Sequence, residues 1–199
     1  MLPLTVDDLL PLEEYAARRK EFFDAHRRYV DRYRRIRIGP KLTLIFENRQ
    51  TLWFRVQELL RLARLDDPEQ IQRELDWYNR LLPTAERLQA SLLIHIPPDA
   101  DRRNALQFWH GLPGNAIQLN LDSLCVPGRL LTSSDTPGTA HWIEFDLNDA
   151  AKEALADFQS EAFFEVDYQS YHVARVLLGE KMRESLLEDV LSMPLVKAA

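Results

Sequence analysis

Apolar residues recur along this chain with two spacings, one typical of strands and one typical of helices. The clearest strand pattern covers residues 87–96, where every second residue from Leu88 to Ile96 is apolar. Successive side chains of a strand point to opposite faces, so Ser91 and His95 share the second face. A lone histidine in such a place is more often a structural residue than a catalytic base.

The remaining patterns complete an alternation of strands and helices. Strands are predicted at 35–38 and 41–46, on either side of Gly39-Pro40, then at 115–121 and 141–147, with a hairpin of 162–166 and 171–177. Helices are predicted at about 11–34, 49–65, 67–79, 101–109, 148–158 and 180–192. These elements predict an α+β fold, in which a mixed, mostly antiparallel sheet of about five to six strands packs with about six helices.

A single domain is predicted over residues 1–199, because the chain has ordinary single-domain length and no repeat, low-complexity tract or linker. Residues 38–65 form one strand–helix unit within it. The stretch TSSDTPGTA at 132–140 is rich in turn-forming residues and predicts a mobile loop.

Composition narrows the class of protein. The net charge of −6 argues against general binding to nucleic acid. No apolar run approaches the roughly 18–20 residues of a membrane span, and the N-terminus lacks the pattern of a secretion signal. The single cysteine, Cys125, allows no intrachain disulfide. We therefore expect a cytoplasmic protein that does not associate with membranes.

Most signatures of catalysis and cofactor binding are missing. The chain has no phosphate-binding GxxxxGK[ST], no GxGxxG, no GxSxG and no HExxH, and its five histidines never lie at a metal-ligand spacing from one another. We therefore expect no cofactor and no metal, although ligands from distant segments could still assemble a metal site.

Three polar residues stand where the strand at 41–46 gives way to a helix. Asn48 is predicted to cap that helix. Arg49 places a cation at the positive end of the helix dipole, which is unfavourable unless an anion lies nearby. One hypothesis is that Glu47 neutralises Arg49. The other is that a ligand anion binds between Arg49 and the helix amides.

Gln57 and Glu58 lie further along the same helix and could join Glu47, Asn48 and Arg49 in one candidate ligand site. In that hypothesis the protein is an enzyme or a small-anion or metal-binding protein, with Glu47 as base or metal ligand and Arg49 as the anion clamp. The alternative is that these residues form solvated helix faces and structural hydrogen bonds.

The helix at 11–34 is strongly basic and interleaved with aromatic residues. Between positions 18 and 37 nine arginines and lysines face only three acidic residues. Because the rest of the chain is acidic, this surface favours docking to an acidic protein, or self-association into a homo-oligomer, over nucleic-acid binding. The predicted docking residues are Arg28, Arg32 and Arg35.

Several stretches together resemble the bacterial domain-of-unknown-function family 3501. They are IGPKLTLIFENR at 38–49 with Thr51 and Gln57-Glu58, then Leu9-Leu10, LEEY at 12–15, IQRELD at 71–76, Tyr78-Asn79 and LQASLLI at 88–94. The resemblance covers nearly the whole chain, and the FENR stretch is its most specific part. One turn departs from the pattern, since Tyr168 in DYQSY stands where an Asp-His-Pro-x-Tyr turn has histidine.

The resemblance implies no established activity. Members of that family tend to be encoded near rubrerythrin-like proteins and iron–sulfur oxidoreductases. The resemblance therefore implies an accessory role beside those redox proteins. One cysteine cannot hold an iron–sulfur cluster that needs several thiolates, so a redox partner would carry the electrons. The favoured hypothesis is a non-catalytic protein that binds an acidic or redox partner; the enzyme or ligand-binding hypothesis comes second and nucleic-acid binding third.

Overall fold

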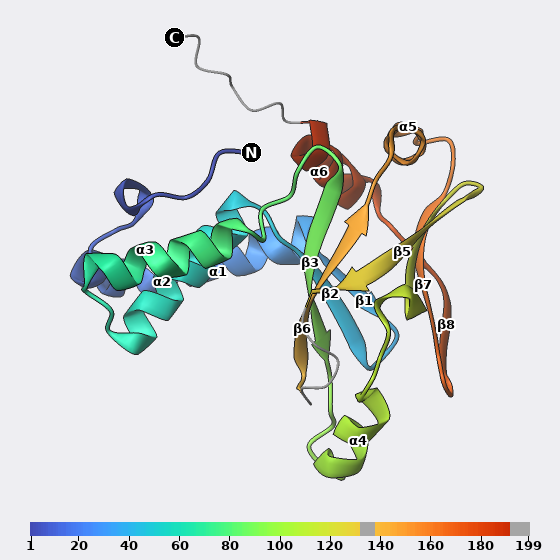
Figure 1. Cartoon of the computed structure of the whole chain (residues 1–199), viewed down its shortest axis with the longest axis horizontal. Helices are drawn as coiled ribbons and strands as arrows, with labels where there is room; N and C mark the ends of the chain where they lie inside the picture. Colours follow the sequence, from blue (N-terminus) through green and yellow to red (C-terminus); the bar gives the residue numbers. More distant parts are fainter. Residues whose placement is uncertain (132–137, 192–199) are drawn as a thin grey trace.

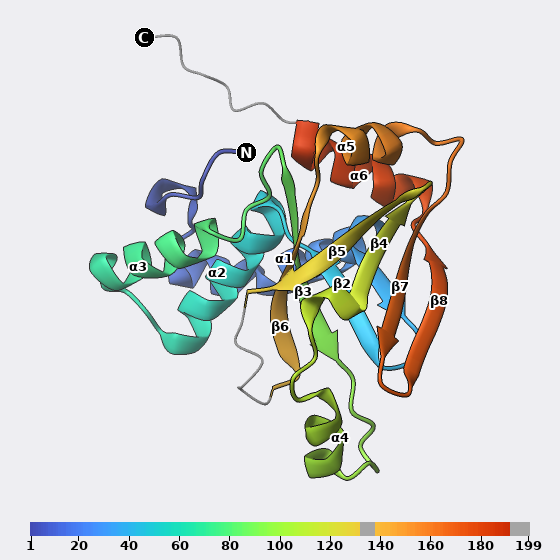
Figure 2. The same ribbon diagram turned by 45° about the vertical axis from the view of Figure 1, so that its right-hand side comes forward.

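Alternating apolar residues build one antiparallel sheet that curls into a nearly closed barrel (Figures 1 and 2). The structure is a computed structural model that describes residues 1–131 and 138–191. The strands are β1 (Arg35–Ile38), β2 (Leu42–Phe46), β3 (Arg87–Ile94), β4 (Ile117–Leu121), β5 (Leu124–Leu130), β6 (Ala140–Asp146), β7 (Ala162–Tyr168) and β8 (Tyr171–Leu177). The helices are α1 (Leu12–Tyr33), α2 (Arg49–Ala63), α3 (Pro68–Asn79), α4 (Arg102–Trp109), α5 (Asp149–Ala156) and α6 (Glu180–Leu191), with short 3₁₀ turns η1 (Val6–Asp8) and η2 (Gly114–Ala116).

The strand order is β1-β2-β3-β6-β5-β4-β7-β8, and each neighbouring pair is antiparallel. β5 joins the two halves of the sheet, since its first residues pair with β4 and its last three pair with β6. β6 is therefore inserted between β3 and β5, although it follows both in sequence.

The edge strands β1 and β8 meet at one end of a seam and separate at the other. Where they meet, the Tyr171 hydroxyl donates to the Ile38 carbonyl at 2.5 Å and accepts from the Lys41 amide at 3.2 Å. Gly39 lies between them with φ of +63°, and a Cβ there would lie 2.5 Å from Tyr171 Oη. This turn therefore requires glycine for both its backbone conformation and its space.

Aromatic rings fill the barrel. Phe46, Phe145 and Phe164 are fully buried, with ring centroids 5.4–6.2 Å apart. A second apolar cluster lies outside the barrel, where Leu52 and Val56 of α2 pack with Leu75 of α3. In Figure 1, α1, α2 and α3 lie on one side of the sheet, α5 and α6 lie at one end of the barrel and α4 at the other.

The structure confirms part of the predicted fold. Within the described residues it has mixed helices and strands, six α-helices and a single domain. The predicted sheet of five to six strands is wrong, because the barrel has eight. The strand that the pattern missed outright is β5, whose central Pro127-Gly128 is typical of a turn. Pro127 is tolerated where β5 passes from β4 to β6 as its partner.

Two further expectations concern the loop at 132–140 and the absence of a membrane-spanning helix. Residues 132–137 of the predicted mobile loop at 132–140 lie outside the described residues, and Ala140 already begins β6. Among the residues that the structure describes, no helix combines the length and apolar character needed to cross a membrane.

Candidate functional site

Glu47 lies just after β2 and is buried, with 1% of its surface exposed. One carboxylate oxygen accepts hydrogen bonds from Arg55 Nη2 at 2.6 Å and from Ser91 Oγ at 2.5 Å. The other oxygen accepts from Thr51 Oγ1 at 2.6 Å. A buried carboxylate needs such partners to remain charged. The carboxylate thus ties β2 to α2 and β3, and its oxygens are engaged by the protein itself.

Asn48 caps α2 as predicted. Its side-chain oxygen accepts from the amides of Gln50 and Thr51, both at 3.1 Å, and Thr51 Oγ1 accepts in return from the Asn48 amide at 2.9 Å. The Asn48 side-chain nitrogen donates to the Tyr29 hydroxyl at 2.7 Å. The cap is therefore also a contact between α2 and α1.

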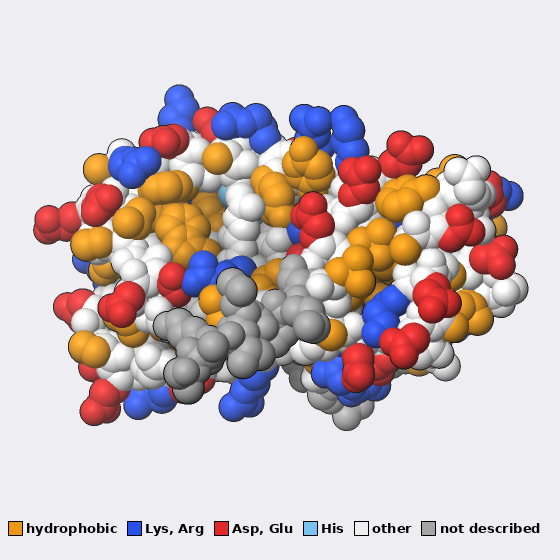
Figure 3. Space-filling model, turned by 90° about the horizontal axis from the view of Figure 1, so that it is seen from above, with side chains coloured by type: hydrophobic (Ala, Val, Ile, Leu, Met, Phe, Trp, Pro, Cys, Tyr) orange, Lys and Arg blue, Asp and Glu red, His pale blue; other side chains and the backbone are white. Residues whose placement is uncertain are grey.

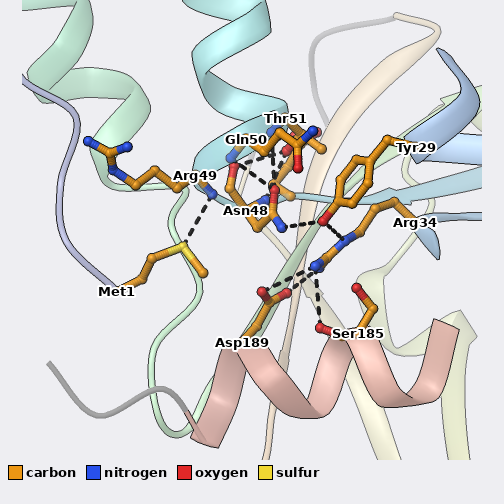
Figure 4. A network of polar contacts seen from close by, with 10 residues as sticks. Met1, Tyr29, Arg34, Asn48, Arg49, Gln50, Thr51, Ser185 and Asp189 are labelled. Atoms are coloured by element: carbon orange, nitrogen blue, oxygen red, sulfur yellow. Dashed lines mark hydrogen bonds and ion pairs between the residues drawn. The ribbon is translucent and has the colours of Figure 1, made fainter. Parts of the chain in front are cut away.

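The Tyr29 contact continues into a second buried network (Figure 4). Arg34 Nε donates to Tyr29 Oη at 2.9 Å, and the Arg34 guanidinium forms an ion pair with Asp189 of α6. Both charged side chains are at most 3% exposed. Burial raises the pKa of Asp189, and the opposing charge of Arg34 counteracts that shift. The network therefore joins α1, the N-cap of α2 and α6.

Arg49 turns away from this network (Figure 4). Its guanidinium pairs with Asp8 at 2.6 Å, while its backbone amide donates to the Met1 sulfur at 3.2 Å. The predicted neutralisation of Arg49 by Glu47 is therefore wrong, because Arg55 pairs with Glu47 and Asp8 pairs with Arg49. The cation at the start of α2 is therefore compensated by Asp8 of η1, which lies 41 residues earlier in the chain.

Glu58 connects α2 to α1. It accepts from the Tyr15 hydroxyl at 2.9 Å and is bound bidentately by Arg19 and by Arg61. Burial alone would raise the pKa of Glu58, but the hydrogen bonds from Arg19, Arg61 and Tyr15 outweigh it and lower the pKa to about 2. Gln57 beside it is fully buried, and neither of its amide atoms has a partner in the described part of the chain.

The five predicted ligand-site residues thus lie in four different settings. Glu47 and Asn48 are less than 7% exposed within hydrogen-bond networks, and Arg49 reaches η1. Gln57 is buried without a hydrogen-bond partner among the described residues, and Glu58 is bound from α1 and by Arg61 of α2. Sequence analysis did not identify the partners Arg55, Ser91, Tyr29, Arg34 and Asp189. No local pattern marks them, since Arg34 stands in a run of exposed arginines and Asp189 lies 155 residues away.

The turn that departs from the family pattern has a structural role in this chain. Tyr168 is 9% exposed, stacks on Trp109 and donates from its hydroxyl to the His110 carbonyl at 3.0 Å. It joins the β7–β8 hairpin to α4. Tyr171, at the other end of the same turn, makes the seam contact with Ile38.

The predicted docking arginines lie on the exposed side of α1 and at its end. Arg28 and Arg32 are exposed, whereas Arg35 is half-buried and forms an ion pair with Asp31. A hollow of about 530 Å³ opens beside Arg32 and Arg35. Its lining includes apolar Ile36, Leu177 and Met182 and charged Asp31, Glu180 and Lys181. The described residues contain no cluster of three His, Cys, Asp or Glu side chains that could hold a metal ion.

Comparisons with known proteins agree with this fold and add no activity. No curated protein matches the chain. The crystal structure of a novel protein of unknown function from Burkholderia pseudomallei is similar, with a TM-score of 0.87 and 28% sequence identity over 95% of this chain and 100% of that chain. The model of a family described as proteins of unknown function (DUF3501) matches residues 3–190. The chain therefore belongs to the DUF3501 family.

Proposed function

We propose that this protein is a non-catalytic accessory protein that binds an acidic protein partner through α1 and the adjoining hollow. The observation that carries the proposal is the position of Arg28 and Arg32. Both are exposed, and neither forms an ion pair with any residue that the structure describes. Figure 3 shows groups of Lys and Arg side chains projecting along one long edge of the molecule.

The hollow beside these arginines favours a partner-binding surface over a helix face that is merely solvent-exposed. It lies at the open end of the seam between β1 and β8, where Ile36 and Met182 form an apolar floor. Leu177 at its edge is 58% exposed. An apolar side chain of the partner would be buried there, while carboxylates around it would meet Arg28 and Arg32.

Arg35 has a different role within this proposal. Because Asp31 already pairs with Arg35, its charge is largely compensated before any partner arrives. Arg35 shapes the wall of the hollow, and Arg28 and Arg32 supply the attraction. The buried state of Glu47 and Asn48 favours this proposal over a ligand site at the FENR stretch, because a ligand would have to displace existing hydrogen bonds.

Family resemblance suggests which partners to test. Rubrerythrin-like proteins and iron–sulfur oxidoreductases carry redox centres, whereas this chain has only one cysteine. In the proposed complex the partner protein holds the redox centre, and this protein binds and positions the partner.

The test compares Arg32→Glu with Arg73→Glu. Both replace one exposed arginine on a helix and change the net charge equally, but Arg73 lies on α3, away from the hollow. Titration calorimetry with the rubrerythrin-like protein and the iron–sulfur oxidoreductase of the same genome would give dissociation constants at low and high salt. We expect Arg32→Glu to weaken one complex about tenfold at low salt and less at high salt, with Arg73→Glu close to wild type.

Two outcomes would contradict the proposal. If neither redox protein binds, the proposed partner class is wrong. If both variants weaken binding equally, the attraction comes from overall charge and not from a docking surface on α1.

A further inference from the structure

Two cavities adjoin at the end of β3 and share the segment His95–Pro97. The first, of about 340 Å³, lies against the β1–β2 turn and is lined by Arg37, Gly39, Pro40 and Thr43. The second, of about 440 Å³, lies on the side of α4 and is lined by Ala100, Arg102 and Thr139. Neither lining includes Arg28 or Arg32, so the two cavities are separate from the proposed docking surface.

The charges around these cavities have one sign. Arg37 lines the first cavity, Arg102 lines the second and His95 lines both, while neither lining contains an aspartate or glutamate from the part of the chain that the structure describes. Within residues 1–131 and 138–191, neither Arg37 nor Arg102 takes part in an ion pair. In a chain with a net charge of −6, a concave region that carries Arg37 and Arg102 attracts anions.

Strand pairing brings the polar groups of the first cavity together. Arg37 on β1 faces Thr43 on β2 in the sheet register. Thr43 Oγ1 lies 2.8 Å from His95 Nε2, and Thr43 itself is only 2% exposed. This bond uses one donor hydrogen of the pair and leaves the other, either the Thr43 hydroxyl hydrogen or the second imidazole N–H, for a ligand. Arg37 adds a guanidinium fork beside the pair, a donor group that binds oxyanions.

Backbone hydrogen bonds hold the frame of the two cavities in place. The His95 amide donates to the Lys41 carbonyl at 2.7 Å, and the Ile94 amide donates to the Thr139 carbonyl at 2.8 Å. On the opposite wall, Tyr171 fixes the turn through its bonds to Ile38 and Lys41. A frame fixed in this way loses little conformational entropy when a ligand binds.

We propose that this region binds a small organic oxyanion, either a phosphate or a carboxylate compound. The anionic group occupies the first cavity, with Arg37 and Thr43 on one wall and His95 on the other. The second cavity takes the remainder of the molecule and places a second negative group near Arg102. The sequence pattern favoured a structural role for His95, and its hydrogen bond with Thr43 agrees with that role. In this proposal His95 also lines the cavities that hold the ligand.

The experiment uses the full chain with inorganic phosphate and citrate as probes, followed by titration calorimetry and by the chemical shifts of the His95 ring. Arg37→Gln is expected to weaken binding of both anions about tenfold or more. Arg102→Gln is expected to weaken citrate binding more than phosphate binding. Arg103→Gln is the matched control, because this neighbouring exposed arginine on α4 lines neither cavity.

The outcomes separate this site from general charge effects and from partner docking. Saturable binding that Arg37→Gln weakens and Arg103→Gln leaves within twofold supports the site. Absence of saturable binding for both probes, or equal losses in Arg37→Gln and Arg103→Gln, overturns it. Arg32→Glu provides an independent check, since it is expected to affect the protein complex and leave anion binding unchanged.

Discussion

Arg34 lies between exposed arginines on α1 and strand β1, yet its own side chain is 1% exposed. Its guanidinium binds Asp189, the Ser185 carbonyl and Tyr29. Bringing two charges into the interior costs several kcal/mol, which is offset only while both partners remain. The pair therefore fixes where α6 packs against the end of α1 more than it adds net stability.

Removing one partner of this pair should be more harmful than removing both. In Asp189→Ala the Arg34 charge stays buried without its counter-ion, and we expect a loss of about 3–5 kcal/mol in the free energy of unfolding. The double variant Arg34→Met/Asp189→Leu leaves no buried charge and should lose less. Urea denaturation of the three proteins provides the comparison, and an equal loss in both variants would rule out the stranded charge as the cause.

Because His26 has a lowered pKa in the folded protein, we expect the free energy of unfolding to depend on pH. It stacks on Phe54 with centroids 3.9 Å apart, and burial, assisted by the charge of Arg55, lowers its pKa to about 4. The unfolded chain takes up the proton near pH 6.5, before the folded protein does. Stability should therefore fall as the pH is lowered from about 6.5 to about 4.

Two variants separate this histidine from the acidic groups. His26→Phe keeps an aromatic ring against Phe54 and should flatten the stability profile between about pH 6.5 and 4. Glu58→Gln should act in a lower range, because a carboxyl with a depressed pKa stabilises the fold above about pH 4.5 and ceases to do so as the pH falls toward 2. Urea unfolding at a series of pH values tests both, and an unchanged slope in His26→Phe would refute the assignment.

At the level of elements, the sequence was sufficient to predict a helix or strand wherever the residues that fix it lie close together in the chain. Asn48, Asp67, Asp101 and Asn148 each precede a helix and each cap it through the side chain. The β7–β8 hairpin was equally visible from its turn. β5 was missed because its Pro127-Gly128 pair is typical of a turn, and the close approach of Gly128 to Gly114 of η2 arises only in the folded chain.

The glycine of β5 offers a direct test of that contact. A Cβ at Gly128 would lie 2.6 Å from Ile143 Cδ1 and 2.9 Å from the Gly114 carbonyl oxygen. Gly128→Ala should therefore lower the free energy of unfolding by about 1–3 kcal/mol through overpacking. Gly179→Ala is the control, because no atom lies within 4 Å of its added Cβ, and it should stay within about 0.5 kcal/mol of wild type. Equal thermal stability of the two variants would contradict the argument.

Over the whole molecule, the α+β class and the helices follow from periodicity, but the strand order does not. Placing β6 between β3 and β5 depends on cross-strand packing, such as Phe145 against Phe46 and Phe164, among residues far apart in sequence. The candidate sites show the same limit. Arg28 and Arg32 are visible in the sequence as a basic run, whereas the grouping of Arg37, Thr43 and His95 requires the register of three strands.

The seam between β1 and β8 has a consequence for how the protein is made. Ile38 contacts Tyr171, which lies 133 positions later in the chain, and Arg34 contacts Asp189, which lies 155 positions later. Barrel closure must therefore wait until Tyr171 and Asp189 have left the ribosome, and contacts of such long range make folding slow. During synthesis the β1–β2 pair emerges early, and the outer edge of each strand lacks a partner and is open to wrong pairing with other nascent chains. Production of this protein should thus depend more on chaperone capacity and on the rate of translation than its final stability would suggest.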